Sequence, residues 1–466
     1  MTAKIFAPDS VRTLAEAERT GLQVAAVLGE FGIGAGDRVV LKAANSAHYV
    51  TVLLGLVEVG ASIVLVDQGD SLSRTEEICR LSGAKLSLVD DDAAYGGEAV
   101  FLDEIHAAAA GVVVEDRPVS FEPWGERPDG LVLWTSGSTG TPKGVVKSGG
   151  RFLRNVERHL AHVGYREDDV ILPLLPFAHQ YGFSMVLAAF ALRCSLVVAP
   201  YRRLDRALRF GAVCGTTVVE ATPATYHSIL RLAAGRPELR QCVERARMTC
   251  AGAASLEKSL SDRYVAEFGR PLLDSYGSTE LGNVAFASPD NPVHCGRPLP
   301  GIALRIVGED GEPLDTAGEV GEIEVESPDA MTGTIAEDGS LVPFPEGWYR
   351  TGDLGRIDEH GNVIVLGRKL AVNRMGYTIY PEAVERKAEE LGCPVKIIST
   401  PDDRGGAQLI FFVADDQRRE PRYWRDRFST ALPVYERPNR VHVLESFPVT
   451  RNGKTDKKKL AELAGH

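Results

Sequence analysis

The sequence lacks the features that usually mark membrane proteins, nucleic-acid-binding proteins and cysteine-based metal sites. Its seven cysteines form no Cys-x-x-Cys pair and have no His-x-x-x-His nearby, so we expect buried thiols in a reducing compartment. The longest apolar segments, such as Val50–Val66, are interrupted by Glu58 and by glycines and fall short of the roughly 20 residues that a membrane helix needs. The formal net charge of -12 argues against a nucleic-acid partner. No signal-type apolar stretch follows the first residues, so we expect a cytoplasmic protein without a membrane partner.

The chain has 466 residues, which is too long for one hydrophobic core and suggests about two to four domains or subdomains. Its first part alternates predicted helices with short apolar strands. Leu14–Phe31 is predicted to be a helix, Asp37–Leu41 a strand and Tyr49–Val59 a second helix. Such alternation indicates an α/β fold whose mostly parallel sheets are flanked by helices on both faces. Further strands are expected at Ile63–Val66, Lys85–Val89, Asp169–Leu172, Ser195–Ala199 and Thr217–Glu220.

The pattern changes after about Ser288. Short strands at Ala303–Val307, Gly321–Val325 and Val363–Leu366 are separated by turn residues and predict a small antiparallel sheet or barrel. From Arg368 onward a compact α+β pattern begins. We therefore expect a large N-terminal domain over residues 1–367, with a β-rich subdomain at 289–367, and a small mobile C-terminal domain over residues 368–466. The elements expected in the small domain are helices at Pro381–Leu391, Arg422–Ala431 and Lys457–Leu463 and strands at Val395–Ser399, Leu409–Ala414 and Arg440–Leu444.

The most informative segment is a polar loop that follows the apolar run Leu131–Trp134. Residues Thr135–Gly144 carry hydroxyls, glycines and Lys143. Glycines let backbone N–H groups approach phosphate oxygens closely, hydroxyls donate further hydrogen bonds, and the lysine adds positive charge. The loop is not the common P-loop, in which Ser or Thr follows Gly-Lys directly. On composition alone such a loop is more often a flexible surface turn, so the phosphate interpretation depends on the rest of the chain.

Further polar segments follow, and each is ambiguous alone. Tyr276–Glu280 offers an aromatic ring, two hydroxyls and a carboxylate that could bind Mg²⁺, although a capped turn is the alternative. Tyr349–Asp353 ends in a carboxylate that could accept both hydroxyls of a ribose, and Arg368 could donate to ribose or phosphate or lie on the surface. Lys454 lies on a glycine turn ahead of a basic helix whose other lysines are expected in solvent.

In their order and spacing these segments resemble the core motifs of the adenylate-forming superfamily, which includes acyl- and aryl-CoA synthetases, the adenylation domains of peptide synthetases, and luciferase. The resemblance extends from about Leu14 to Leu463. It implies that the chain binds ATP and Mg²⁺, with Glu280 as the Mg²⁺ ligand and Thr279 at the α-phosphate. The other residues it assigns to ATP are Thr135, Ser136, Gly137, Ser138, Thr139, Gly140 and Lys143 at the β- and γ-phosphates, Gly252, Ala253 and Ala254 along the adenine, Tyr276 on the base, and Asp353 with Arg368 at the ribose.

The same resemblance gives Lys454 a catalytic role. This lysine would reach from the small domain to the carboxylate and the bridging oxygen during adenylation. Attack of a carboxylate on the α-phosphate brings two anions together, so Mg²⁺ and a lysine are needed to stabilise the developing charge. A lysine on a separate domain can leave the site before a second reaction. The hinge is expected at Lys369 or Leu370, but Gly367–Gly376 is one residue shorter than usual, which leaves the rotation and the thioester step open.

The acid is expected to bind beside Pro176–Met185. Peptide-synthetase domains that take α-amino acids usually place an aspartate there, and this segment has no carboxylate, so a buried substrate ammonium would be unpaired and costly. Ala178–Tyr181 and Asn373–Gly376 instead resemble aryl-acid ligases, and we expect an aromatic or other compact non-amino acid rather than an aliphatic one. Gln180 in place of the usual Asn argues against a 2-hydroxybenzoate-type substrate. The residues assigned to the acid are Phe177, His179, Gln180, Ala251, Gly252, Gly277 and Ser278. The catalytic candidates are His179, Thr279, Glu280 and Lys454. For His179, a histidine buried in the core is the alternative.

These assignments predict an acid–thiol ligase. A carboxylic acid and ATP would give acyl-AMP and pyrophosphate, and the acyl group would then pass to the thiol of coenzyme A or of the phosphopantetheine on a carrier protein. Transfer to an amine or another nitrogen nucleophile is an alternative, and a non-catalytic homologue that only binds nucleotide is a more remote one. The expected partners are therefore a small carboxylic acid and ATP. A carrier protein is a further partner if the acceptor is its phosphopantetheine rather than coenzyme A.

Overall fold

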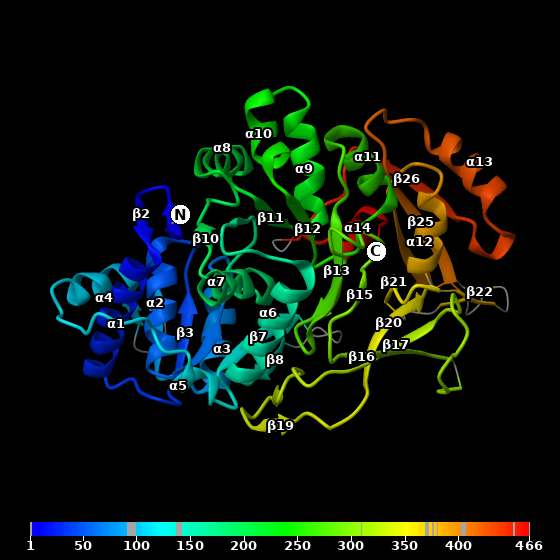
Figure 1. Ribbon diagram of the computed structural model, residues 1–466. Coiled ribbons are helices and arrows are strands. Elements are labelled where there is room, and N and C mark those ends of the chain that lie inside the picture. Colours follow the sequence, from blue (N-terminus) through cyan, green and yellow to red (C-terminus); the bar gives the residue numbers. More distant parts are fainter. Residues whose placement is uncertain are drawn as a thin grey trace.

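The computed structural model describes residues 2–90, 99–136, 142–308, 310–368, 372–374, 377–379, 381–401, 407–450 and 453–465. Two large sheets and their helices make up most of the blue and green parts of the ribbon, and smaller sheets lie in its yellow and orange parts together with the β18–β19 hairpin of one large sheet (Figure 1). Within the described residues, no helix is both long enough and apolar enough to cross a bilayer.

One large sheet has eight strands in the order β19-β18-β8-β7-β4-β3-β5-β6. Strands β3 to β7 are short apolar runs that pair in parallel, whereas β8 returns antiparallel to β7. The hairpin β18–β19 comes from much later in the chain and pairs with the other edge of β8. The strands are β3 (Arg38–Lys42), β4 (Ser62–Leu65), β5 (Leu86–Val89), β6 (Ala99–Phe101), β7 (Leu131–Ser136), β8 (Pro142–Lys147), β18 (Gly333–Ile335) and β19 (Leu341–Pro343).

The other large sheet has nine strands in the order β15-β14-β13-β12-β11-β9-β10-β1-β2. All neighbours from β13 to β1 in this order are parallel, so the loops that follow β11, β12 and β13 open at the same edge of the sheet. The strands are β1 (Lys4–Ala7), β2 (Ser10–Thr13), β9 (Val170–Pro173), β10 (Ser195–Val197), β11 (Val218–Ala221), β12 (Met248–Ala251), β13 (Leu273–Ser278), β14 (Gly282–Phe286) and β15 (Arg297–Pro298).

Helices flank both sheets. α1 (Leu14–Glu30), α2 (Ala47–Glu58), α6 (Gly149–Val163) and α7 (Gln180–Leu192) share one hydrophobic core with residues of both sheets. α8 (Leu204–Cys214), α9 (Pro223–Ala233), α10 (Pro237–Arg245) and α11 (Lys258–Phe268) cover the other face of the nine-stranded sheet, and α3 (Leu72–Ser82) packs on the outer face of the eight-stranded sheet. The predicted α/β fold is therefore confirmed. Two short helices, α4 (Leu102–Ala109) and α5 (Glu122–Gly125), complete this part.

The boundary of α2 shows what periodicity misses. This helix begins at Ala47 rather than at the predicted Tyr49, because Ser46 caps it: the backbone N–H of Tyr49 donates to the Ser46 hydroxyl at 3.0 Å. A capping hydroxyl fixes where a helix starts by satisfying a backbone donor, whatever the apolar pattern inside the helix.

The smaller sheets follow. β16 (Ala303–Val307), β17 (Gly321–Glu326), β20 (Tyr349–Ile357) and β21 (Val363–Arg368) form the predicted small antiparallel sheet, in the order β16-β17-β20-β21. Its register sets the backbone of Arg368 directly opposite that of Asp353. The two residues expected at the ribose are thus cross-strand neighbours.

Residues 381–465 are called the C-terminal unit below. Their apolar side chains form hydrophobic clusters separate from those of the large sheets. The boundary between two domains stays a prediction, and the hinge candidates Lys369 and Leu370 lie outside the described residues. The elements are α12 (Pro381–Glu389), β24 (Val395–Pro401), β25 (Ala407–Ala414), α13 (Pro421–Ala431), the 3-10 turn η1 (Val434–Glu436), β26 (Arg440–Leu444) and α14 (Lys457–Leu463), preceded by the hairpin of β22 (Val372–Arg374) and β23 (Tyr377–Ile379).

Candidate functional site

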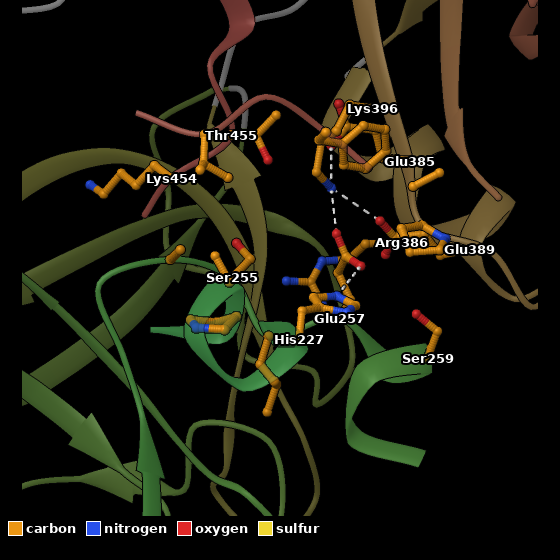
Figure 2. A pocket seen from close by; sticks show the side chains of 18 of the residues that line it. His227, Ser255, Glu257, Ser259, Glu385, Arg386, Glu389, Lys396, Lys454 and Thr455 are labelled. Carbon is orange, nitrogen blue, oxygen red and sulfur yellow. Dashed lines mark hydrogen bonds and ion pairs between the residues drawn. The ribbon is translucent and has the colours of Figure 1, made fainter. Parts of the chain in front are cut away.

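A cavity of about 860 Å³ lies between the loops after β11, β12 and β13 and the C-terminal unit. Figure 2 looks into it, with Lys454 on one side of the view and the charged groups around Lys396 on the other. The cavity brings together residues that the sequence spreads over two hundred positions. Those among its lining residues that were predicted as site residues are Ala253, Ala254, Tyr276, Gly277, Asp353 and Lys454.

Tyr276 and Asp353 form the nucleotide end of this arrangement. The hydroxyl of Tyr276, on β13, donates to Oδ2 of Asp353 on β20 at 2.7 Å, and both side chains are buried. The Asp353 backbone N–H in turn donates to the Thr351 hydroxyl at 3.1 Å. The ring predicted to stack on the base and the carboxylate predicted to hold the ribose therefore already touch each other.

The backbone after β12 is unusual where the adenine was predicted to lie. Ala253 has φ +66°, in the left-handed region that costs a non-glycine residue about 1–3 kcal/mol. Gly252 is needed for close approach, because a Cβ atom there would lie 2.6 Å from the Ser275 hydroxyl and 2.8 Å from Cε1 of Tyr181. Strain of this kind is often kept at binding sites, which supports the predicted role of this segment.

The phosphate end starts at the β7–β8 hairpin. Thr135 and Lys143 are cross-strand partners, while Gly137, Ser138, Thr139 and Gly140 lie outside the described residues. Nζ of Lys143 is 3.9 Å from Oε1 of Glu280, and the Glu280 side chain is 20% exposed. The structure thus brings the predicted phosphate lysine beside the predicted metal carboxylate.

Lys147, at the end of β8, was missed by the sequence reasoning. Its side chain has no exposed surface, and Nζ donates to the carbonyl oxygens of Thr279 at 3.1 Å and Glu280 at 3.4 Å. Burial lowers the pKa of Lys147 to about 7, although the Glu280 and Asp329 carboxylates act in the opposite direction. A lysine just before a helix-capping serine, here Ser148 ahead of α6, is usually exposed, so no local signal indicated its burial.

The residues predicted for the acid have different environments. His179 precedes α7 as its N-cap, with Nε2 3.4 Å from Oδ2 of Asp67, and Asp67 also pairs with Arg202 at 3.2 Å. The Gln180 amide donates to the carbonyl oxygen of Ser278 at 3.0 Å, which links α7 to the end of β13. Phe177 and Ala251 have no exposed surface and belong to the hydrophobic cores.

A buried carboxylate lies behind the predicted acid segment. Both oxygens of Glu220, on β11, accept hydrogen bonds from tyrosine hydroxyls, one from Tyr165 and the other from Tyr181. Burial raises the pKa of Glu220 to about 7. Pro176–Met185 contains no carboxylate of its own, but the fold supplies one from a different strand. A charged residue inside the apolar run Val218–Ala221 was the available sequence signal.

A second lysine, Lys396 on β24, is mostly covered, with 15% of its side chain exposed, and joins the C-terminal unit to the rest of the molecule. Nζ lies 3.2 Å from a carboxylate oxygen of Glu257, the N-cap of α11, and 3.4 Å and 3.1 Å from those of Glu385 and Glu389 on α12 (Figure 2). Burial alone would lower the pKa of Lys396, but the three carboxylates raise it well above its usual value. Glu257 also has His227 3.7 Å away. The cluster therefore contains an ion pair between elements far apart in the chain.

Lys454 reaches the cavity on a tight turn. The backbone N–H of Thr450 donates to the carbonyl oxygen of Lys454 at 2.7 Å, and Gly453 has φ +73°. A Cβ atom at Gly453 would lie 2.7 Å from the hydroxyl of Thr222, the N-cap of α9. The turn is thus packed against the loop after β11, and only glycine fits there without movement.

Comparisons with known proteins show the family and the fold of the chain. A family model described as AMP-binding enzyme matches residues 2–334. The fatty acid–[acyl-carrier-protein] ligase ScoC of Streptomyces coeruleorubidus is 26% identical over 494 residues, covering 99% of this chain and 93% of the relative. The salicyl-AMP ligase / salicyl-S-ArCP synthetase of Mycobacterium tuberculosis is 28% identical over 490 residues, covering 97% and 85%. The ATP-bound structure of MatB from Rhodopseudomonas palustris superposes with a TM-score of 0.86 at 24% identity, covering 99% and 96%.

The family match, the named relatives and the shared fold confirm the predicted resemblance to the adenylate-forming superfamily. Because the family model spans more than half of the chain, the chain belongs to the AMP-binding enzyme family.

Proposed function

We propose that this enzyme activates a compact carboxylic acid with ATP and then transfers the acyl group to the thiol of a phosphopantetheine. In the first step a carboxylate oxygen bonds to the α-phosphorus, the bond to the bridging oxygen breaks, and pyrophosphate leaves. In the second step the thiol sulfur bonds to the acyl carbon, AMP leaves, and the thiol proton passes to solvent. The main support is the single cavity shared by the Tyr276–Asp353 pair and the Lys454 turn.

Each residue would have a distinct task in the first step. Asp353 would exchange its hydrogen bond from Tyr276 for the ribose hydroxyls, and Lys143 would neutralise the outer phosphates. Lys454 would meet the carboxylate and the bridging oxygen, where negative charge concentrates as the two anions approach. For the second step, we propose that the C-terminal unit carries Lys454 away, so that the thiol can enter.

The residues present suit Mg²⁺. Glu280 offers one partly exposed carboxylate next to a phosphate-binding lysine, and Mg²⁺ in nucleotide sites usually takes one or two carboxylates with phosphate oxygens and water. We therefore assign Glu280 as its protein ligand. When bound, the ion would neutralise charge on the phosphates.

The thiol acceptor and the acid are supported less directly. Two relatives that match nearly the whole chain are named for carrier-protein thioesters and four others for coenzyme A thioesters, so the relatives support a thiol acceptor of either kind. We keep an aromatic or other compact non-amino acid as the substrate class.

Acid-dependent ATP–pyrophosphate exchange over a panel of aryl, alkyl and amino acids tests the first step. The best acid is then incubated with ATP and coenzyme A, with a phosphopantetheinylated carrier protein, or with an amine, and the products are identified by mass spectrometry. Exchange with an aryl or other compact acid and a thioester of coenzyme A or of the carrier protein are expected. If none of the acids in the panel supports exchange, the proposal is overturned. If an amide forms in the absence of any thiol, the nitrogen-acceptor alternative is established instead.

A further inference from the structure

Lys147 is a buried lysine that has no evident use in the fold. Its side chain has no exposed surface, and the partners of its Nζ atom are two carbonyl oxygens, those of Thr279 and Glu280. Among the described residues, no carboxylate forms an ion pair with it. Burying an ammonium without a paired anion is costly, whereas an apolar chain of similar length, such as methionine, would fill the same space at no such cost.

The strand that carries Lys147 ends the predicted phosphate loop. On β8, Lys143 and Lys147 lie opposite Thr135 and Leu131 of β7, so both lysines are on the same face of the sheet. Lys143 approaches the carboxylate of Glu280, and Lys147 holds its carbonyl oxygen. The two lysines of this one strand thus contact both the side chain and the main chain of Glu280.

The carbonyl oxygen of Glu280 is fixed from two sides. It accepts a hydrogen bond from the backbone N–H of Met331 at 2.7 Å as well as from Lys147. The carbonyl oxygen of Thr279 is held by Lys147 as well, at 3.1 Å. Because these two residues follow β13 in a turn, the main-chain contacts determine where the threonine hydroxyl and the glutamate carboxylate can point.

We propose that Lys147 is a positioning residue that ties the main chain of Thr279 and Glu280 to the strand carrying Lys143. The hydroxyl, the carboxylate and the Lys143 ammonium then keep one geometry towards Mg²⁺ and the phosphates of ATP. The inference rests on the proposed adenylation, and it adds a residue that contacts neither nucleotide nor metal itself.

The test compares Lys147→Met and Lys147→Gln with wild type in acid-dependent pyrophosphate exchange. The readouts are the Mg²⁺ concentration for half-maximal rate, KM for ATP, KM for the acid, and the thermal unfolding temperature. Groups that orient a metal ligand typically affect metal affinity or activity by about 10–100-fold. We expect a change of this size in the Mg²⁺ requirement or the exchange rate for Lys147→Met, an unchanged KM for the acid, and an unfolding temperature no lower than that of wild type. Lys147→Gln, which keeps an amide NH2 donor group, is expected to lie between Lys147→Met and wild type.

Lys42 supplies the matched control, because it is another lysine with a fully buried side chain in the same sheet, on β3 rather than β8. Lys42→Met is expected to leave the Mg²⁺ requirement unchanged. The inference is overturned if Lys147→Met retains the wild-type Mg²⁺ and ATP dependence, or if its activity falls only together with its stability. Failure of both Lys147 variants to fold would also overturn it, since the lysine would then serve the fold. A wild-type protein without exchange on any acid refutes the proposed function instead.

Discussion

Replacing Glu257 with glutamine should change the balance between the two proposed half-reactions. Glu257 and Lys396 are 3.2 Å apart and join the large sheets to the C-terminal unit in the orientation that packs the Lys454 turn against Thr222. If the unit rotates before thiol transfer, this pair must break. At an effective dielectric constant of about 20, two charges at that distance attract by about 5 kcal/mol. Desolvation offsets much of this, and Lys396 keeps Glu385 and Glu389 as partners in either orientation.

The net loss in Glu257→Gln is therefore about 1–2 kcal/mol, or roughly a 5–30-fold shift in the orientational equilibrium. Acid-dependent pyrophosphate exchange should fall, and thioester formation from synthetic acyl-AMP and the acceptor thiol should rise. Opposite changes in the two rates would be the signature of a shifted equilibrium, because a general loss of stability would lower both.

Arg231→Gln provides the control for this experiment. Arg231 and Glu445 also connect the two parts, at 3.9 Å, but their side chains are 66% and 52% exposed, and exposed pairs contribute about 0–1 kcal/mol. This variant should leave both rates close to wild type. The reasoning about Glu257 would be refuted by a parallel fall of both half-reactions or by no change in either.

Other substitutions test the remaining assignments. Lys454→Ala should lower acid-dependent pyrophosphate exchange by about 100-fold or more while ATP binding, measured by calorimetry, is retained; exchange that survives would remove the lysine from the reaction. Asp353→Asn should raise KM for ATP by about tenfold in the exchange assay with little change in kcat, and an unaltered KM would contradict its place at the ribose. For Glu220→Gln the stability difference from wild type should depend on pH. Burial raises the pKa of Glu220 from 4.5 to about 7. The contribution of Glu220 to the free energy of unfolding is therefore fully present below about pH 4.5, and about 3 kcal/mol of it is lost as the pH rises through 7. Urea unfolding at pH 5 and pH 8 measures this, and a pH-independent difference would refute it.

Local pattern predicted the architecture because apolar runs and turn residues are properties of short segments. The strands Ala303–Val307 and Arg440–Leu444 and the helix Lys457–Leu463 have the predicted bounds. The start of α2 was misplaced because its position depends on the Ser46 cap rather than on apolar spacing. The cross-strand pairing of Asp353 with Arg368 was not predicted from spacing, since it depends on the register of β20 against β21.

The missed residues are those whose role depends on tertiary burial. Lys147 and Lys396 have ordinary local surroundings in the sequence, and only the fold covers all of the first side chain and most of the second. Part of the Lys396 cluster could be predicted from the sequence, because Glu385 and Glu389 are four residues apart on one helix and so share a face. Glu257 comes from another region of the chain, and no local rule connects it to them. The same holds for Glu220 and Tyr181. Both residues can be read from the sequence, but their hydrogen bond depends on the fold and could not be predicted.

The pairing of β8 with β18 has a consequence for how the chain folds. β8, the strand that follows the phosphate loop, pairs with β7 on one edge and with β18 (residues 333–335) on the other. Because β18 is synthesised long after β7 and β8, the second edge of β8 stays unpaired until then. During synthesis, and in any fragment that stops before this point, β8 would be an unprotected sheet edge able to pair with another chain. Fragments ending near residue 330 should therefore aggregate, whereas fragments that include the β18–β19 hairpin should remain dispersed, and light scattering can distinguish the two. The β18–β19 hairpin thus protects the strand that follows the predicted phosphate loop from intermolecular strand pairing.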